Sequence, residues 1–240
     1  MAVVFDAAGP NRRHKEYEEY KAQRDKAPEE MLESLKDVHE ITRALRIPEI
    51  TYSGAEADDV IGTIAVQAEK AGFHTWLVTP DKDLAQLVTE STNLYRISHT
   101  SGSPAAIYGL SQVRERWGIA DVSQVVDTLA LVGDAVDNIP GVPGIGEKTA
   151  QKLLAQFGTV EEIIACSADL KGKQRGRISQ YSEQALLSKS LAKIDVDIPV
   201  DIDLESFVRL DPDPDVTIAI FDRLEFRLLK ERLFGEAGED

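Results

Sequence analysis

With 240 residues, of which 42% are hydrophobic, the chain can bury a substantial core as one large domain or two modest ones. A charged fraction of 29% is typical of a globular protein in water, and the longest apolar runs are too short to cross a bilayer, which excludes a membrane partner. The net charge of −15 opposes binding to nucleic acid, but basic residues cluster in RRHKEYEEYKAQR and in KGKQRGR.

The first hundred residues alternate between predicted strands and helices. The apolar run at residues 2–5 predicts a short buried strand, and IPEI and HTWLVT predict two more. SGAEADDVIGTIAVQAEKAG predicts an amphipathic helix, and the helix before it would place Leu32, Leu35, Val38, Ile41 and Leu45 along one face. This alternation indicates an α/β fold with a central, largely parallel sheet, which we assign to residues 1–106.

The pattern changes near Ile107, after which the recognisable segments are helical. LSQVRERWG, VSQVVDTLALVG, GEKTAQKLLAQFG, TVEEIIACS and QYSEQALLSKSLAKI each predict a helix, and residues 216–233 predict a last one after the linker DPDPD. The cluster KGKQRGR between them is compatible with a solvated loop. We therefore assign residues 107–240 to a helical region.

Eight acidic residues stand in four short segments at the ends of these elements. They are Asp6, Glu56, Asp58, Asp59, Asp81, Asp83, Asp134 and Asp137. The first and third segments follow predicted strands, at the sheet edge where ligands bind in open α/β folds. The second segment occupies the first turn of a helix, and the fourth follows a helix. Each segment alone has a structural explanation, because acids stabilise a helix N-terminus by about 0.3–1 kcal/mol and aspartate is a common turn residue.

Together, the four segments indicate a site for divalent metal ions. If the carboxylates meet at one sheet edge, they repel one another unless cations lie between them. Oxygen ligands point to Mg²⁺ or Mn²⁺, and the single cysteine excludes a cysteine-type zinc site and fits a reducing, cytoplasmic setting. Two such ions about 3.5–4 Å apart would suit hydrolysis of a phosphodiester. No Ser-His-Asp, Cys-His, P-loop or GxGxxG pattern offers a competing chemistry.

The stretch GVPGIGEKTA, at residues 141–150, has the form of a helix-hairpin-helix. Gly144 and Gly146 can adopt backbone angles closed to other residues, so their amides can face outward together. The next helix adds unpaired N–H groups, and Lys148 and Lys152 lie one turn apart on one face of it. The motif predicts a grip on a DNA backbone phosphate without reading of sequence, and its structural alternative is a tight turn between helices.

With these residues in place, the chain resembles the flap endonuclease family, and within it the 5′ nuclease domain of bacterial DNA polymerase I. The resemblance runs nearly end to end and is carried by VVFDAAGPNRRHKEYEEYKAQR, SGAEADDVIGTIA, TPDKDLAQLV and LALVGDAVDNIPGVPGIGEKTAQKLL. It implies a PIN-like nuclease core with an arch or clamp, followed by a helix-3-turn-helix DNA-binding module. It also implies cleavage of 5′ ends and flaps of branched DNA with two Mg²⁺ ions, in replication and repair.

The resemblance also implies roles for individual residues. The acids of the first two segments look like ligands of the catalytic metal, and the other four look like ligands of a second metal. Lys21 and Arg24 match catalytic clamp residues that approach the scissile phosphate, and the carbonyls around Val142 and Ile145 resemble a K⁺ site. Tyr20 resembles an aromatic residue that stacks on a terminal base. The implied DNA-binding set is Arg12, Arg13, Tyr20, Gly144, Gly146, Lys148, Thr149 and Lys152.

One departure from the family pattern bears on the expected activity. Family members begin with a strand that ends in DG, whereas this sequence starts on a later strand and lacks that first metal-binding aspartate. We therefore expect a nuclease of impaired activity or, as an alternative, a DNA-binding module without catalysis; a polymerase domain would continue the chain in a longer gene product. A third reading, a haloacid-dehalogenase phosphatase, rests on VVFDA, but the second acid that those enzymes need is missing after Asp6.

Overall fold

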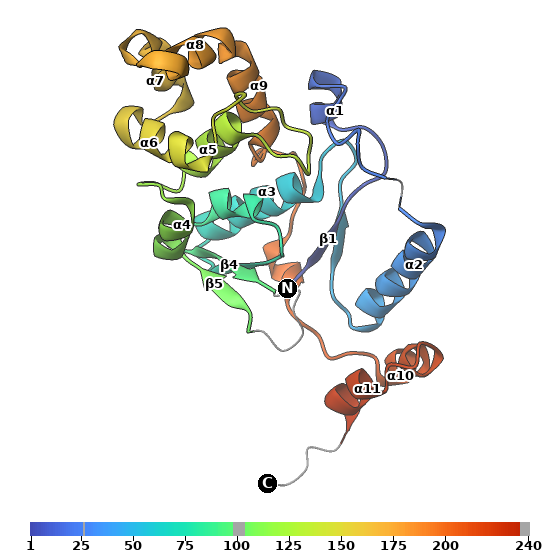
Figure 1. The fold of residues 1–240 in the computed structure, drawn as a ribbon. Coiled ribbons are helices and arrows are strands. Elements are labelled where there is room, and N and C mark those ends of the chain that lie inside the picture. Colours follow the sequence, from blue (N-terminus) through green and yellow to red (C-terminus); the bar gives the residue numbers. More distant parts are fainter. Residues whose placement is uncertain (26, 98–103, 236–240) are drawn as a thin grey trace. The chain divides into compact units, whose positions relative to one another are not determined.

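The computed structural model describes residues 1–25, 27–97 and 104–235, which form two compact units interleaved along the chain (Figure 1). The smaller unit comprises the described residues of 1–7, 25–52 and 201–240, and the larger comprises those of 8–24 and 53–200. We predicted two domains that follow one another along the chain, residues 1–106 and 107–240. The two units of the structure are instead each made of separate segments of the chain. The domain boundary near Ile107 stays a prediction.

The smaller unit combines a pair of strands with helices. β1 (Val3–Phe5) pairs in parallel with β2 (Glu49–Thr51), and the chain between them forms α2 (Glu29–Ala44). The last segment of the unit forms η3 (Leu204–Phe207), α10 (Pro214–Arg223) and α11 (Arg227–Phe234). The start of α10 is held at the end of α2, because the N–H of Asp213 donates to the carbonyl of Ala44 at 3.1 Å.

In the smaller unit one apolar helix face is exposed and one helix prediction is wrong. Helix α2 exposes much of its apolar face, at Leu32, Leu35 and Val38, because a helical period shows which residues share a face but not what covers it. The single helix predicted at residues 216–233 is divided into α10 and α11. Glu225 lies between them with a left-handed φ of 59°, a backbone angle at which an α-helix cannot continue.

The larger unit contains a mixed sheet. β3 (Thr75–Val78) pairs in parallel with β4 (Thr92–Arg96), which pairs antiparallel with β5 (Ala106–Tyr108), and η1 (Asp83–Leu87) lies between β3 and β4. The sequence did not predict β4 and β5. β3 is not the fully buried strand we expected, because Leu77 is buried whereas Trp76 and Val78 are exposed. The α/β class is confirmed.

Helices make up the rest of the larger unit. They are α1 (Arg12–Glu16), α3 (Ala57–Lys70), α4 (Leu110–Trp117), α5 (Gln124–Val132), α6 (Glu147–Phe157), α7 (Val160–Ala165), the short η2 (Ser167–Asp169), α8 (Gly172–Gln180) and α9 (Ser182–Ala192). The helices predicted in this unit are confirmed, and α8 shows that KGKQRGR is helical rather than a loop. No helix in the described ranges has both the length and the apolar composition that crossing a bilayer requires.

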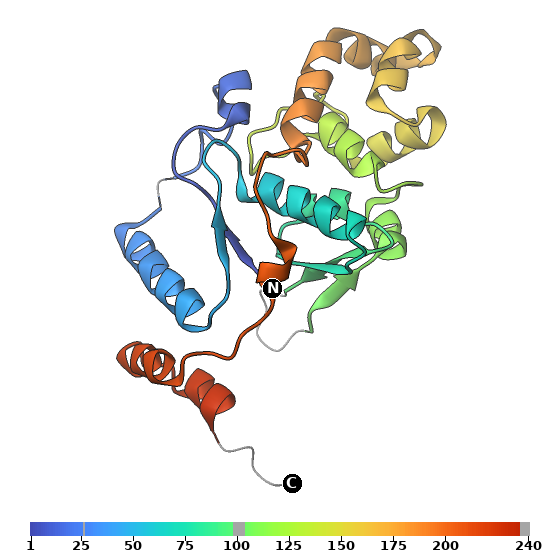
Figure 2. The ribbon, with the colours of Figure 1, turned by 180° about the vertical axis from the view of Figure 1, so that it is seen from behind.

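Helix α5 is the centre of the helical part of the larger unit. Residues 124–131 are all buried, and Figures 1 and 2 show α5 between α6 and α9. A helix that is buried on every side is held rigidly by its neighbours. α5 therefore fixes the position of the acidic turn that begins directly after it, at Asp134.

Candidate functional site

The segment of residues 8–24, which we call the clamp segment, brings its cations onto two of the predicted metal ligands. Nζ of Lys21 donates to Oε1 of Glu56 at 2.7 Å and lies 3.6 Å from Oδ2 of Asp137. Arg24 donates to Oδ1 of Asp137. Lys21 has a left-handed φ of 57°, and its own N–H donates to the carbonyl of Asp137 at 3.1 Å, so the turn holds its backbone as well as its side chain.

Tyr20 also contacts these two acids. Its hydroxyl is 3.0 Å from Oε2 of Glu56 and 3.1 Å from Oδ2 of Asp137, and its ring is only 2% exposed. Burial and the two negative charges raise the pKa of Tyr20, so the hydroxyl keeps its proton. The structure thus places the Tyr20 ring in the core rather than on a surface that a base could stack on.

Arg13 occupies a buried position behind the same acids. Its guanidinium donates to both oxygens of Asp59, at 2.7 and 2.8 Å, and to Oε2 of Glu56 at 3.2 Å. It also donates to the carbonyls of Leu191 and Lys193, each at 2.8 Å. Burial alone would raise the pKa of Asp59, but the hydrogen bonds from Arg13 and its charge hold it below the usual value. Arg13 therefore joins the clamp segment, the start of α3 and the end of α9.

A second group of acids surrounds the loop after β3. Lys82, between Asp81 and Asp83, donates to Oδ2 of Asp134 at 2.7 Å. Burial alone would raise the pKa of Asp134, but this hydrogen bond and one from the N–H of Val136 hold it below the usual value. For Asp83, burial and the charges of neighbouring aspartates, Asp81 first, raise the pKa to about 7. Oδ1 of Asp83 is buried and has no hydrogen-bond partner in the described part of the chain.

These acids have the chemistry of a site for hard cations. Their donors are carboxylate oxygens, which Mg²⁺ and Mn²⁺ prefer, and the raised pKa of Asp83 reflects burial and, after it, negative charge that a divalent ion would offset. Within the described ranges, no three His, Cys, Asp or Glu side chains converge closely enough to hold one ion. Lys21, Arg24 and Lys82 instead contact the carboxylates as counter-charges.

Two other predicted ligands are placed separately. Asp58 lies half-buried in the first turn of α3, one residue before Asp59. Asp6 belongs to the smaller unit, where it directly follows β1 and is exposed. Of the remaining acids, the larger unit brings five together in two groups, Glu56 and Asp137 with the clamp cations and Asp81, Asp83 and Asp134 around Lys82, while Asp59 is held by Arg13.

The hairpin between α5 and α6 depends on glycine at two positions. Gly141 has a φ of 60°, and a Cβ there would lie 2.4 Å from the backbone nitrogen of Gly133. Gly144 has a φ of 78°, as predicted, whereas Gly146 has an ordinary φ of −101°. A Cβ on Gly146 would meet nothing within 4 Å, so its backbone faces open space at the start of α6. Gly146 is thus dispensable for the turn and leaves room for a close approach to the helix N-terminus.

The side chains of the hairpin divide into a buried and an exposed set. Val142 and Ile145 are buried against α5 and α6, and the carbonyl of Val142 accepts from the N–H of Ile145 at 3.0 Å. Lys148 and Lys152 are exposed on α6, with Thr149 half-buried beside them. The exposed side of the hairpin therefore carries the residues that the motif assigned to DNA.

Three contacts of polar and basic side chains around the site were not predicted from the sequence. Lys82 stands in the motif TPDKD, but its ion pair with Asp134 joins segments that are far apart in the sequence. Asn11 caps α1 and donates to Oε1 of Glu56 at 2.9 Å. Arg177, in the cluster KGKQRGR, donates to the carbonyl of Gly144 at 2.7 Å, so α8 supports the hairpin turn.

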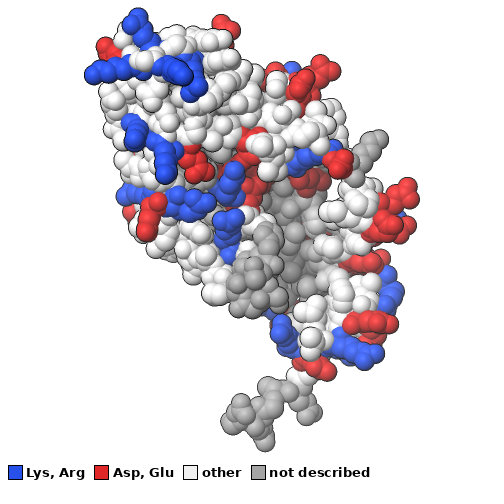
Figure 3. Space-filling view, in the orientation of Figure 1, with Lys and Arg blue, Asp and Glu red and all other residues white. Residues whose placement is uncertain are grey.

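Basic side chains gather on one face of the larger unit in spite of the net charge of −15. Figure 3 shows Lys and Arg side chains over α4, α6 and α8. The exposed basic residues of these three helices include Arg114, Arg116, Lys148, Lys152, Lys173 and Arg175. A basic face of this kind suits a polyanion, because phosphate binding depends on local rather than net charge.

Comparison with known sequences gives matches along most of the chain. The family model described as 5′-3′ exonuclease, N-terminal resolvase-like domain, matches residues 1–118, and the one described as 5′-3′ exonuclease, C-terminal SAM fold, matches residues 120–215. DNA polymerase I of Bacillus caldotenax is 40% identical over 241 residues, and that of Bacillus subtilis (strain 168) is 38% identical over 240. Each alignment covers 100% of this chain and 27% of the relative, so the chain spans about a quarter of their length.

Solved structures with the same fold include nucleases. The bacteriophage T5 5′-exonuclease with bound zinc is 25% identical with a TM-score of 0.71, over 94% of this chain and 83% of that one. A T5 flap endonuclease in a complex with DNA and metal ions is 26% identical with a TM-score of 0.69, over 93% and 84% of the two chains. The catalytic core of Rad2 with DNA substrate has a TM-score of 0.64 at 18% identity, over 99% and 80%, which shows the fold alone.

Proposed function

Because the chain belongs to the 5′-3′ exonuclease family, we propose that it is a divalent-metal-dependent nuclease that hydrolyses phosphodiester bonds at 5′ ends and 5′ flaps of DNA. The observation that carries this proposal is the contact of the clamp cations Lys21 and Arg24 with Glu56 and Asp137. The T5 flap endonuclease, which shares the fold, forms a complex with DNA and metal ions, and this supports the same chemistry here.

We assign the acids to binding of divalent ions. Glu56, Asp81, Asp83, Asp134 and Asp137 would hold Mg²⁺, with Mn²⁺ as a substitute. When bound, the ions supply the Lewis acidity that activates water and stabilises the leaving oxygen. Asp6 and Asp58 stay predicted ligands. Asp59 receives a different role, because both of its oxygens accept from Arg13 and it anchors that guanidinium.

The clamp cations bind the scissile phosphate in this account. Lys21 and Arg24 are neutralised by carboxylates, and they can exchange these partners for a phosphate once divalent ions neutralise the acids. Tyr20 and Arg13 hold Glu56 in place from behind rather than contacting DNA. Arg12 is exposed beside Ser190 and stays a proposed DNA contact.

The hairpin holds the duplex away from the cleavage point. Gly146, Lys148, Thr149 and Lys152 would bind backbone phosphates without reading sequence, with the N–H groups at the start of α6. Gly144 shapes the turn that presents them. A K⁺ ion on the carbonyls near Val142 and Ile145 stays a prediction.

The longer relatives suggest the context in which the nuclease works. Because the chain matches about a quarter of each DNA polymerase I, we propose that a polymerase domain is covalently continuous with it in the full gene product. Removal of 5′ ends ahead of such a polymerase would serve replication and repair. The cytoplasmic setting stays a prediction.

A labelled 5′-flap duplex incubated with the protein and Mg²⁺ tests the function. We expect cleavage near the branch that stops when the metal is chelated, with a 5′-phosphate on the product. Binding of the flap duplex without cleavage at any Mg²⁺ or Mn²⁺ concentration would instead support the alternative of a DNA-binding module. Release of phosphate from a small monoester would favour the phosphatase reading, which neither family match supports.

A further inference from the structure

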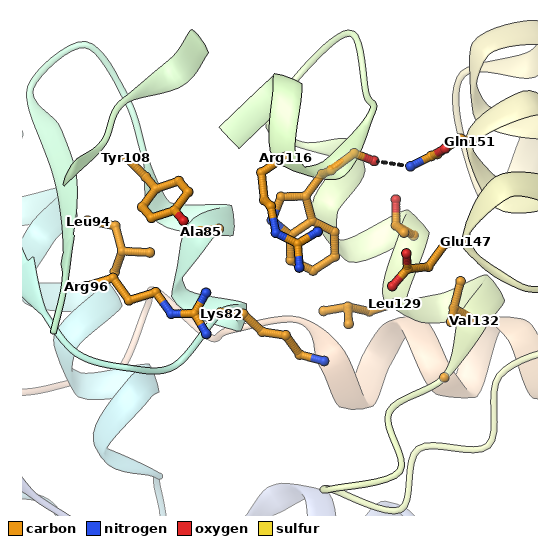
Figure 4. Close-up of a pocket in the computed structure, with 13 residues that line it drawn as sticks. Lys82, Ala85, Leu94, Arg96, Tyr108, Arg116, Leu129, Val132, Glu147 and Gln151 are labelled. Atoms are coloured by element: carbon orange, nitrogen blue, oxygen red, sulfur yellow. Dashed lines mark hydrogen bonds between the residues drawn. The ribbon is translucent and has the colours of Figure 1, made fainter. Parts of the chain in front are cut away.

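A small cavity lies between the acids around Lys82 and the hairpin. Its volume is about 110 Å³, and its lining comes from η1, β4, β5, α4, α5 and α6, all within the larger unit. Three basic side chains extend into it from different elements, namely Lys82, Arg96 and Arg116 (Figure 4). None of the residues to which we have assigned a metal-binding or hairpin role lines this cavity.

The basic side chains of the cavity are suited to phosphate. Arg96 and Arg116 have no hydrogen-bond or ion-pair partner within the described ranges, whereas Lys82 already contacts Asp134. A planar guanidinium offers paired N–H donors that match phosphate oxygens. Glu147 at the rim carries the opposing charge. Two unpaired guanidiniums beside one carboxylate leave the cavity with capacity for an anion.

The remaining lining is suited to a base or sugar. The aromatic side chains of Tyr108 and Trp117 contribute to the wall, and buried Leu94 and Leu129 form an apolar floor. The backbone of Trp117 is tied to α6, because its carbonyl accepts from Nε2 of Gln151 at 2.9 Å. Aromatic faces stack on nucleic-acid bases with little preference for sequence.

The size of the cavity favours part of a polymer over a whole ligand. Sites that enclose a small molecule usually have about 300–1,000 Å³, which exceeds this volume. Lys82, Arg116 and Glu147 are exposed, so a strand could enter and leave at this side. Lys82 connects the cavity to Asp134, a candidate metal ligand.

On these grounds, and resting on the proposed nuclease function, we propose that this cavity holds one nucleotide of the DNA strand next to the cleavage point. Arg96, Arg116 and Lys82 bind its phosphate, and Trp117 with Tyr108 contacts its base or sugar. By holding this nucleotide, the cavity would position the DNA strand so that its neighbouring, scissile phosphate lies at the candidate metal ligands.

Equilibrium binding of a 5′-flap duplex without divalent metal, where no cleavage occurs, tests this role. Arg96→Ala and Arg116→Ala should each weaken binding by about tenfold and lower the dependence of log Kd on log salt by about one. Arg209→Ala is the matched control, because it removes the same charge from an exposed position that neither lines the cavity nor belongs to the basic face of α4, α6 and α8. Equal Kd values for all three variants would overturn the proposal.

The fluorescence of Trp117 shows what enters the cavity. Trp76 and Trp117 are the two tryptophans of the sequence, so Trp76→Phe leaves one reporter. Flap DNA should quench it, and a deoxynucleoside monophosphate or inorganic phosphate should need far higher concentrations. Equal quenching by the free nucleotide, without displacement by DNA, would show a site for free nucleotides instead and overturn the proposal. Cleavage of the flap duplex by the unmodified protein is measured alongside. Cleavage without quenching by DNA would overturn the cavity proposal alone, whereas loss of cleavage would count against the nuclease function itself.

Discussion

Asp83 differs from Glu56, Asp134 and Asp137 in having no cation on its buried oxygen. Lys82 contacts Asp134, and the clamp cations contact Glu56 and Asp137, whereas Oδ1 of Asp83 has no partner among the described residues. Burial and nearby negative charge raise its pKa to about 7. A divalent ion beside Asp83 would favour the ionised form and reverse this shift.

The raised pKa predicts a pH dependence of stability in metal-free protein. Because folded Asp83 holds its proton more tightly than the unfolded chain does, its contribution is fully present below the ordinary pKa of 3.8 and is lost as pH rises through about 7. Relative to Asp83→Asn, which stays neutral, the unmodified protein should therefore lose stability between about pH 4 and pH 8.

Urea unfolding of both proteins across this range measures the effect. Mg²⁺ should remove the difference for the unmodified protein, because it binds the ionised carboxylate. A stability difference that does not change with pH, or that Mg²⁺ leaves unaltered, would contradict the assignment of Asp83 to the metal site.

Replacement of Tyr20 by phenylalanine separates two roles for this residue. If Tyr20 positions Glu56 and Asp137 through its hydroxyl, Tyr20→Phe should lower the cleavage rate by about tenfold and weaken Mg²⁺ binding. If the ring stacks on a terminal base, phenylalanine keeps the stacking and the rate should not change. Tyr17→Phe is the control, because Tyr17 is half-buried in the same segment and its hydroxyl has no hydrogen bond in the described ranges.

At the scale of elements, the hairpin uses its glycines for two different purposes. The backbone of Gly144 has a left-handed φ and lies against the guanidinium of Arg177, which a Cβ would approach to 2.4 Å. Gly146 has ordinary angles and open space around it. The first glycine is therefore needed for the turn, and the second for access to the amides of α6.

Alanine substitutions should show this division. Gly144→Ala should cost about 1–2 kcal/mol of stability, because the left-handed conformation is strained with a side chain. Gly146→Ala should fold with less than about 1 kcal/mol of loss but bind DNA more weakly, because its methyl group stands in front of the helix N-terminus. Thermal unfolding and DNA Kd measure the two effects, with Gly176→Ala on exposed α8 as the control. Equal effects of both substitutions on both measurements would contradict the division.

The sequence predicted elements best where their signals are local. The 3.6-residue period identified α3 to α7 and α9, and the glycine pattern placed the hairpin between α5 and α6. It failed where the answer depends on distant neighbours, as in the exposed side chains of β3. The break at Glu225 also escaped, because a left-handed residue other than glycine leaves no clear signal in the sequence.

At the scale of the whole molecule, the sequence named the acids of the candidate site but not their partners. Residue type and position at element ends single out carboxylates. The pairing of Lys82 with Asp134 and of Lys21 with Glu56 joins segments far apart in the chain, and only the fold brings them together. The burial of Tyr20 and Arg13 could not be read from a polar, basic stretch for the same reason.

The charge distribution of the whole molecule also follows from the fold. A net charge of −15 would repel DNA if it were spread evenly. Instead, the charge is uneven: several acids lie at the candidate metal site, and α4, α6 and α8 present basic side chains on one face (Figure 3). The proposed nuclease function therefore needs both regions, one to bind the strand and one to cut it, and substitutions in one region should leave the other unaffected.

Asp134→Asn, assayed for both cleavage and binding of one 5′-flap duplex, tests the central claim most directly. If the acids hold the metal ions that cut DNA, cleavage in Mg²⁺ should fall by roughly 100-fold or more, while the Kd measured without metal changes by less than about threefold. Asp169→Asn, an exposed acid of η2, should leave both unchanged. Cleavage at the unmodified rate, or equal loss of cleavage and binding, would contradict the claim.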